Sequence, residues 1–348
     1  MLTTQMPKSI VSASRAQLGL SGLIISRTPL RLTLGGGGTD LPPYFSKYGG
    51  FVVTSALDKY VYLLVKRRFE EEVRLSYSTT EIVRSINEIR HPVVREALRL
   101  LGLKSQLEIV SLGDLPAETG LGSSGSFTVG LLNSLHTLKG ESLSRCELAE
   151  EACFLEMEVL KEPSGVQDPY AAALGGFTCL DISRNGKVSI SPLRLSDDVI
   201  HELQNSLVFF YTGIKRSSTP VLESQRSFIN HDIEAIDAMH RIREIAVKVR
   251  RALETGDLPE FGRLQHEHWL AKKQTSPRIS SGPIDRYYAN GLKNGALGGK
   301  LMGAGGGGFL LFYCENGKDR LRKAMAMDGL KEVRFGFESE GSKIAINI

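Results

Sequence analysis

The sequence predicts an α+β protein of two domains. With 348 residues, the chain is longer than a single hydrophobic core usually supports. Strand-like segments alternate with glycine-rich loops and helices up to about residue 195, whereas helical periodicity dominates residues 221–293, before strands and a helix alternate again in the tail. We therefore expect an extension over residues 1–22, one domain over residues 23–195 and a second over residues 196–348. Ligands are expected in the cleft between the two domains.

The composition is that of an ordinary folded protein. Apolar residues make up 41% and charged residues 24%, which excludes the low hydrophobicity and high charge of disorder. Basic residues alternate with acidic ones, as in residues 66–71, so a nucleic-acid-binding surface is not predicted. The four cysteines lack CxxC spacing and fit buried free thiols in a reducing cytosol. Without an apolar run of 18 residues or a signal-peptide core, we expect a cytoplasmic protein that does not contact the membrane.

Residue periodicity predicts the elements of the first domain. Apolar and β-branched runs predict strands over residues 23–34, a pair within 51–69, and strands over 106–112, 177–182 and 188–193. Helical spacing predicts helices over residues 93–101, 127–138, 144–160 and 168–174. Ser144 and Glu147 have the spacing of a capping box, which supports the start of the third helix.

The second domain is predicted to contain more helix. Helical spacing and caps predict helices over residues 221–255, 258–273, 283–293 and 319–329. Apolar runs predict strands over residues 207–211, 296–302 and 308–314, and near Val333 and Ile344.

A glycine-rich stretch directly before the predicted helix at 127–138 suits phosphate binding. It runs through Pro116, Gly120, Leu121, Gly122, Ser123, Ser124 and Gly125. Glycines let the backbone approach an anion, and a helix N-terminus presents unpaired N–H groups with a partial positive charge. The two serine hydroxyls can serve a phosphate oxygen or a Mg²⁺ ion. A capped turn that binds nothing is the simpler alternative.

The same stretch also matches the G-x-G-x-x-G pattern of dinucleotide-binding proteins, with Glu141 as the ribose-binding acid. A proline-bearing segment separates Gly120 from the strand that ends near Leu112, which disfavours this alternative. The distant stretch 303–308 satisfies the same pattern, so the match carries little weight. A Walker A loop is excluded, because glycine-lysine is nowhere followed by serine or threonine.

The first glycine cluster ends in polar side chains suited to a sugar. Gly37 and Gly38 leave the backbone without side chains, and Thr39 and Asp40 can bind the hydroxyl groups of a sugar. The carboxylate of Asp40 can accept hydrogen bonds from two hydroxyl groups at once. A turn with an Asx cap is the alternative.

The third glycine cluster spans residues 303–308 between two apolar strands. Ordering each glycine costs about 0.5 to 1 kcal/mol more than ordering alanine, so a purely structural hairpin has no reason to concentrate them. We expect the loop to pack closely against a ligand, with Gly305 and Gly306 at the substrate, or against another loop.

In this order, the three clusters resemble the motifs of the GHMP kinases, the family of galactokinase, homoserine kinase and mevalonate kinase. The resemblance spans about residues 24–315, and residues 116–125 depart from the family's phosphate loop only at Gly125, where alanine is usual. It implies a ribosomal S5 domain 2-like N-terminal domain, a ferredoxin-like C-terminal domain and phosphoryl transfer from ATP, with Mg²⁺, to an alcohol.

Within the family, residues 27–31, 35–44, 166–173 and 211–217 are most similar to heptose 7-phosphate kinases. This resemblance implies phosphorylation of the anomeric hydroxyl of D-glycero-D-manno-heptose 7-phosphate, for nucleotide-activated heptose and surface glycans. Galactose is a poor candidate, because Gly37 and Gly38 stand where galactokinase has glutamate and histidine. The alternatives are another GHMP sugar kinase, for example one acting on fucose, an NAD(P)-dependent oxidoreductase, and a sugar-binding regulator without turnover.

By matching positions, the resemblance implies roles for individual residues. Asp168 takes the place of the catalytic aspartate, Arg31 lies near the acceptor, and Glu156 and Ser124 bind Mg²⁺. The alternatives are a helix N-cap for Asp168, a surface position for Arg31 and a solvated acidic face for Glu156.

Lys215 and Arg216 form a basic loop with Ser217 that suits the distal phosphate of the acceptor. The expected partners are therefore ATP and a sugar phosphate. Self-association into a homodimer is left open.

Overall fold

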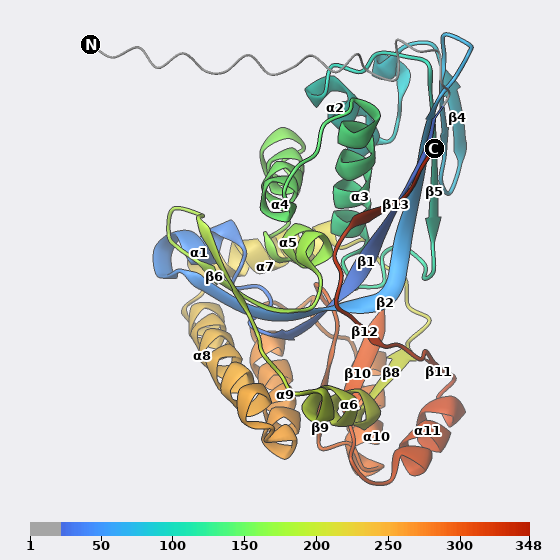
Figure 1. Cartoon of the computed structure of the whole chain (residues 1–348). Coiled ribbons are helices and arrows are strands. Elements are labelled where there is room, and N and C mark those ends of the chain that lie inside the picture. Colours follow the sequence, from blue (N-terminus) through green and yellow to red (C-terminus); the bar gives the residue numbers. More distant parts are fainter. Residues whose placement is uncertain (1–21) are drawn as a thin grey trace.

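The computed structural model describes residues 22–348, which form two sheets with helices packed against them (Figure 1). The larger sheet has the strand order β13-β1-β2-β5-β3-β4, with β12 and β6 also pairing with β2, and β7 with β6. The smaller sheet has the order β11-β8-β10-β9. The predicted α+β class is confirmed. The predicted extension lies outside the described residues except for Gly22.

The larger sheet is organised around one long strand. β1 (Leu23–Gly35) pairs antiparallel with residues 53–66 of β2 (Gly50–Arg67). The other edge of β2 pairs first with β6 (Phe177–Ile182) and then with β5 (Leu107–Gly113). The predicted pair of strands within 51–69 is wrong, because Asp58 and Lys59 form a bulge opposite Pro29 and Leu30 instead of a turn.

Helices of the first domain cover one face of this sheet. They are α2 (Pro92–Leu100), α3 (Ser123–Leu138), α4 (Arg145–Cys153), the π-helical turn η3 (Phe154–Val159) and α5 (Gln167–Leu174). Apolar residues such as Val129 and Leu132 bury α3 against β1 and β2. The predicted capping box of Ser144 and Glu147 is confirmed, and both of its hydrogen bonds are present.

The charged stretch before α2 has more structure than its sequence predicts. It contains β3 (Val73–Ser76), β4 (Thr80–Val83) and η2 (Ile86–Glu88). A further helix that the sequence did not predict, α1 (Pro42–Tyr48), follows the first glycine cluster. These elements are short, so few apolar positions mark them. β7 (Val188–Pro192) completes the first domain. Cys146 is exposed, so the expectation of buried thiols is wrong for this residue.

The smaller sheet contains β8 (Leu207–Tyr211), β9 (Gly298–Leu301), β10 (Phe309–Tyr313) and β11 (Lys331–Glu332). The accompanying helices are α6 (Asp197–Ser206), α7 (Thr219–His231), α8 (Ile233–Thr255), α9 (Leu258–Lys273), α10 (Gly282–Lys293) and α11 (Lys318–Met327). The single helix predicted over residues 221–255 is instead two, because the Asp232 side chain caps α8 at the backbone N–H of Ala235.

The two halves of the chain share one core. Phe209 and Leu311 of the smaller sheet belong to the same buried cluster as Leu32 and Leu57 of the larger one. β12 (Phe337–Glu338) and β13 (Lys343–Asn347) return to the larger sheet and pair with β2 and β1. The division at residue 195 stays a prediction, and the chain crosses back over it at its C-terminal end.

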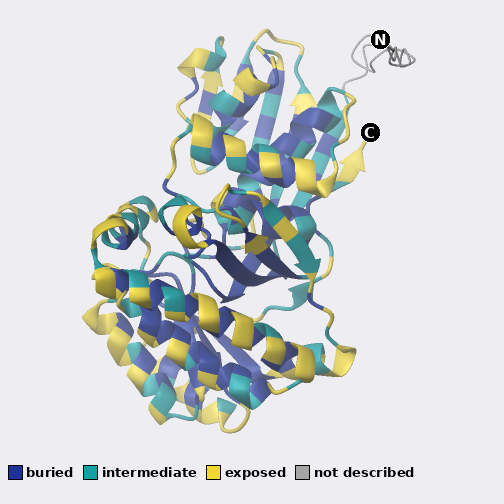
Figure 2. Ribbon diagram, turned by 90° about the vertical axis from the view of Figure 1, so that its left-hand side faces the viewer, coloured by how far each residue is buried: buried dark blue, intermediate teal, exposed yellow. Residues whose placement is uncertain are grey.

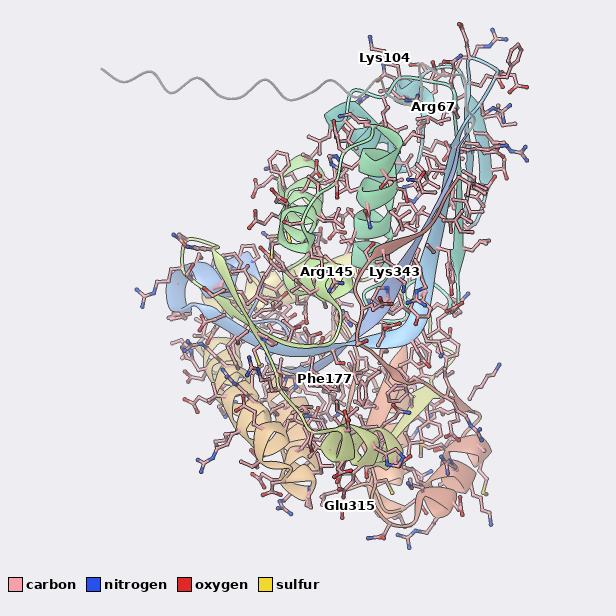
Figure 3. The ribbon with its side chains drawn as sticks, in the orientation of Figure 1. Arg67, Lys104, Arg145, Phe177, Glu315 and Lys343 are labelled. Carbon is pink, nitrogen blue, oxygen red and sulfur yellow. The ribbon has the colours of Figure 1, made fainter. Side chains whose placement is uncertain are left out.

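Exposed residues lie on the outer faces of the helices and on outer strands such as β4, β7 and β13, whereas β8, β9 and β10 are buried (Figure 2). In Figure 3, Arg67 and Lys104 lie at one end of the molecule and Glu315 lies at the other. None of the helices within residues 22–348 is long and apolar enough to cross a membrane.

Candidate active site

A cavity of about 620 Å³ lies where the two sheets and their helices meet. Its walls come from β1, the first glycine cluster, the loop and start of α3, the start of α5, the loop before α7, α9 and β9. Twelve of the site residues predicted from the sequence line this cavity: Arg31, Gly37, Gly38, Asp40, Gly120, Gly122, Ser123, Ser124, Gly125, Glu156, Asp168 and Arg216.

The loop before α3 has the backbone of an anion-binding turn. Gly120 and Gly122 have φ angles of 85° and 75°, in the left-handed region that favours glycine, and Gly122 is the N-cap of α3. A side-chain cap on α3 is absent from the described structure, so the first N–H groups of the helix are free to face the cavity. The Leu121 carbonyl accepts a hydrogen bond from the Arg31 N–H at 3.0 Å, which ties this loop to β1.

The dinucleotide-binding alternative is not favoured by the topology. It requires a parallel β-α-β unit directly around the loop. Here β5 and β6, the strands on either side of α3, both pair antiparallel with β2, and the two strands are not neighbours in the sheet.

Arg31 and Asp168 form a two-point ion pair beside this loop. Arg31 Nε and Nη2 donate to the two Asp168 carboxylate oxygens at 2.6 and 3.0 Å, and Nη1 donates to the Gly120 carbonyl at 2.6 Å. Only 4% of Arg31 is exposed, so the alternative of a surface arginine is wrong. The N-cap of α5 is Val166, so the alternative of a capping role for Asp168 is wrong as well.

Glu156 lies in the π-helical turn η3, a distortion that often marks functional positions. It is 3% exposed, which rules out a solvated acidic face. Burial, followed by the charges of Asp168 and Glu162, raises the pKa of Glu156 to about 7, although a hydrogen bond from Thr128 at 2.7 Å acts in the opposite direction. Within residues 22–348, no basic side chain forms an ion pair with it. The Thr128 hydroxyl also lies 3.1 Å from the Ser124 carbonyl, so Glu156 sits beside the first turn of α3.

The first glycine cluster presents Asp40 to the cavity. The Asp40 carboxylate accepts hydrogen bonds from the backbone N–H of Gly38 at 3.0 Å and from the Gln167 N–H and side-chain amide, each at 3.2 Å. Burial, followed by the charge of Asp168, raises the pKa of Asp40. Thr39 does not line the cavity. It is fully buried, and its hydroxyl lies 2.8 Å from the Gly36 carbonyl and accepts from the Phe51 N–H at 3.1 Å.

The third glycine cluster packs against the phosphate loop, backbone to backbone. A Cβ atom on Gly303 would overlap the Cα of Gly120, and one on Gly308 would overlap the Thr119 carbonyl. The expected packing against another loop is therefore confirmed. Gly305 and Gly306 are not among the cavity-lining residues, which include Gly303 and Ala304.

Three buried side chains of the cavity wall escaped the sequence analysis. They are His268 and Lys272 on α9 and Lys300 on β9. The Lys300 ammonium donates to the Leu34 carbonyl at 2.9 Å, and that of Lys272 donates to the Gly303 carbonyl. For the two residues on α9, the sequence pattern that could have revealed them is a set of polar residues at helical spacing on the buried face of an amphipathic helix: Gln265, His268 and Lys272. Lys215 is exposed and does not line the cavity, unlike Arg216.

Two family models match the chain. The model of the GHMP kinases N terminal domain matches residues 87–176, which include the phosphate loop and Asp168, and the model of the GHMP kinases C terminal domain matches residues 249–327, which include Lys272 and Gly303.

Similarity to individual proteins extends over nearly the whole chain. The D-glycero-alpha-D-manno-heptose 7-phosphate kinase of Campylobacter jejuni is 31% identical, over 92% of this chain and 98% of its own length. The crystal structure of a D-glycero-D-manno-heptose 1-phosphate kinase from Bacteroides thetaiotaomicron is 26% identical, with a TM-score of 0.76 over 92% of this chain and 97% of that one. Lactococcus lactis galactokinase, at 18% identity and a TM-score of 0.71 over 92% of this chain and 95% of its own, shares the fold. The chain therefore belongs to the GHMP kinase family.

Proposed function

We propose that this protein transfers the γ-phosphoryl group of ATP to the anomeric hydroxyl of D-glycero-D-manno-heptose 7-phosphate, giving the 1,7-bisphosphate and ADP. The observation that carries the reaction class is the Arg31–Asp168 ion pair beside the free N-terminus of α3, in one cavity with Glu156. The acceptor is supported by the 31% identity to the heptose 7-phosphate kinase, which extends over 92% of this chain. The product would serve the synthesis of nucleotide-activated heptose for surface glycans.

In this proposal, the nucleotide lies with its phosphates at the start of α3. The amides of Ser123, Ser124 and Gly125 would donate to phosphate oxygens, which the helix dipole favours. The cavity is also lined by Val61, Tyr77, His91, Leu112 and Phe127, and the ring of His91 contacts those of Tyr77 and Phe127. These aromatic and apolar side chains would suit a flat purine base.

Asp168 is the proposed base. It would orient the anomeric hydroxyl and accept its proton as the bond from the hydroxyl oxygen to the γ-phosphorus forms and the bond from that phosphorus to the ADP oxygen breaks. Arg31 holds both carboxylate oxygens of Asp168, which fixes the orientation of the base. The same guanidinium donates to the phosphate loop at Gly120, so one side chain aligns the base with the phosphates.

The residues of the cavity fit a magnesium ion. Glu156 is a buried carboxylate without a basic partner in residues 22–348, and such a charge is costly unless a cation compensates it. Glu156 and the Ser124 hydroxyl would hold the ion, whose remaining positions water and phosphate oxygens fill. When bound, the ion would neutralise charge on the phosphate oxygens.

Asp40 and the first glycine cluster would receive the sugar. The Asp40 oxygens are oriented by Gly38 and Gln167: Oδ1 accepts two hydrogen bonds and Oδ2 one, so Oδ2 retains capacity to accept a further hydrogen bond from a sugar hydroxyl. Gly37 and Gly38 carry no side chains, which leaves space for an acceptor bulkier than galactose. Thr39 is too deeply buried for direct contact, and its role in this proposal is to brace the loop.

The proposal is tested by measuring ADP release with a panel of acceptors: heptose 7-phosphate, unphosphorylated heptose, galactose and L-fucose. We expect the highest kcat/KM with heptose 7-phosphate. L-Fucose belongs in the panel because the chain is 27% identical to a Bacteroides fragilis L-fucokinase/L-fucose-1-P guanylyltransferase, over 86% of this chain but only 35% of that protein. A higher kcat/KM with L-fucose would overturn the acceptor assignment. NADH binding without ATP binding would overturn the reaction class.

A further inference from the structure

Within residues 22–348, three cations of the cavity, Lys272, Arg216 and Lys300, have backbone carbonyls as their only hydrogen-bond partners, and the first two are bonded to the third glycine cluster. Lys272 Nζ donates to the carbonyl of Gly303, and Arg216 Nε donates to that of Gly305. Arg31, in contrast, is neutralised by Asp168. Within the described residues, neither Lys272 nor Arg216 forms an ion pair with a carboxylate. The third glycine cluster thus holds in place two basic side chains that form no ion pair within the described residues.

These charges are largely removed from water. Lys272 is 7% exposed, and Arg216 Nη2 is buried without a hydrogen-bond partner in residues 22–348. One helical turn before Lys272, both ring nitrogens of His268 are buried and unpartnered. Buried donors without acceptors cost free energy, and the cost is larger when they are charged. An anion placed between them would remove that cost.

We propose that Lys272 and Arg216 form the subsite that binds the distal phosphate of the acceptor, with His268 as a further donor on the same wall. The inference rests on the proposed function, because it requires a phosphorylated acceptor. Arg216 contributes a guanidinium that can bind two phosphate oxygens, and Lys272 contributes an ammonium with two N–H groups left after its bond to Gly303. Lys215, the neighbouring cation in the sequence, has no part in this subsite.

The electrostatic neighbours of Lys272 favour the acceptor over the nucleotide. The pKa of Lys272 is lowered to about 7, first by burial and then by Arg31 and Arg216, and the carboxylates that act against this are Asp40 and Asp168. These are the two carboxylates assigned to the sugar. The nucleotide phosphates already have the α3 N-terminus as their receptor. The unmatched positive charge therefore lies on the acceptor side.

Lys272→Met tests the subsite, with Lys273→Met as its matched control. Lys273 follows on the same helix but pairs with Asp285 at 3.2 Å, outside the cavity. We expect Lys272→Met to lower kcat/KM for heptose 7-phosphate roughly 10- to 100-fold through KM, and to change kcat/KM for unphosphorylated heptose less than 3-fold. Lys273→Met should resemble the wild type with both sugars. Equal losses on both sugars, or a raised KM for ATP, would overturn the inference, since the cation would then serve the nucleotide.

A binding measurement separates this inference from the proposed function. If the wild type fails to phosphorylate heptose 7-phosphate, the proposed function fails, but the subsite remains testable with inorganic phosphate in calorimetry. We expect the wild type and Lys273→Met to bind phosphate with the same affinity. In Lys272→Met and in Arg216→Met, the affinity for phosphate should be at least 10-fold lower. Equal affinity in all four proteins would overturn the subsite. Replacing a buried lysine by methionine removes a desolvated charge, so the folded state should be retained, which thermal unfolding will check.

Discussion

Gly125 leaves room for Asp168 at the point where α3 meets α5. A Cβ atom at position 125 would lie 2.8 Å from the Asp168 Cβ and 3.0 Å from its carbonyl carbon. Gly125 is buried and has the ordinary negative φ angle of a helical residue, so the backbone conformation does not require glycine at this position. The glycine therefore allows the helix that carries the proposed base to approach the phosphate loop closely, at a position where alanine is usual in the family.

Gly125→Ala should displace Asp168 from its present position. The added methyl group has to move α5 or the carboxylate by a few tenths of an ångström, and misplacement of a catalytic group by about 1 Å can cost 100-fold in rate. We expect kcat to fall about 3- to 10-fold with little change in KM for ATP. Gly282→Ala is the control, because a Cβ atom there meets nothing within 4 Å. An unchanged kcat in Gly125→Ala would mean that α5 adapts without moving the base.

Arg31→Lys should reduce turnover although it preserves the charge. A lysine cannot donate to both Asp168 oxygens and to Gly120 at once, as the guanidinium does. We expect kcat to fall at least 10-fold, and Asp168→Asn to cost 100-fold or more. The control is Arg27→Lys, since Arg27 pairs with Glu338 and Glu340 away from the cavity. Wild-type turnover by Asp168→Asn would remove Asp168 as the base.

Much of this site is local in the sequence, and that part was predictable. The phosphate loop is a turn followed by a helix within ten residues, so glycine placement and helix periodicity predict both its shape and its chemistry. Arg31 and Asp168 are 137 positions apart, and only the family resemblance paired them. Periodicity alone cannot reveal such pairing, because it describes each element and not the neighbours it acquires in the fold.

The remaining errors have physical causes. Thr39 was expected to contact substrate. Its hydroxyl instead forms hydrogen bonds with the neighbouring backbone at Gly36 and Phe51, so the side chain can be buried in the loop. Lys272 was overlooked because a lysine near the end of a helix is normally solvated. The Lys272 ammonium is instead bonded to the carbonyl of Gly303, in the third glycine cluster where it approaches the phosphate loop closely, and this long-range contact is not encoded in the helix itself.

The pH dependence of stability should report on Glu156. Its pKa rises from the ordinary value of 4.5 to about 7 in the folded protein. Between these values the folded state binds more protons than the unfolded state, so the free energy of unfolding falls as the pH rises. Glu156→Gln removes this loss, and above pH 7 it should be more stable than the wild type by up to about 3 kcal/mol. Urea unfolding of both proteins from pH 4.5 to 8 without Mg²⁺ measures the difference, and parallel pH profiles would contradict it.

The pH dependence of acceptor binding should report on Lys272. With a pKa of about 7 in the empty cavity, this ammonium loses its proton as the pH rises, and phosphate then loses its partner. Arg31, Arg216, Lys300 and His268 surround it as cations or donors, and Asp40 and Asp168 oppose them. We expect KM for heptose 7-phosphate to increase between pH 7 and 8.5 in the wild type. The profile should be flat in Lys272→Met, and an equally steep rise in that variant would contradict the assignment.

Gly303→Ala should weaken nucleotide binding because its methyl group would clash with the backbone of the phosphate loop, in addition to straining its own backbone. Gly303 has a φ angle of 73°, and a Cβ atom there would overlap the Cα of Gly120 in the phosphate loop. Gly329→Ala is a matched control, because Gly329 has a φ angle of 81° but a Cβ atom there meets nothing within 4 Å. Both variants bear the cost of a left-handed alanine, about 1 kcal/mol; Gly329→Ala should lose about that much stability, and Gly303→Ala at least that much. Only Gly303→Ala should also raise KM for ATP, by about 10-fold or more, because only this methyl group pushes the phosphate loop away from the start of α3. Equal KM values for ATP in the two variants would mean that the two loops can separate without affecting the nucleotide.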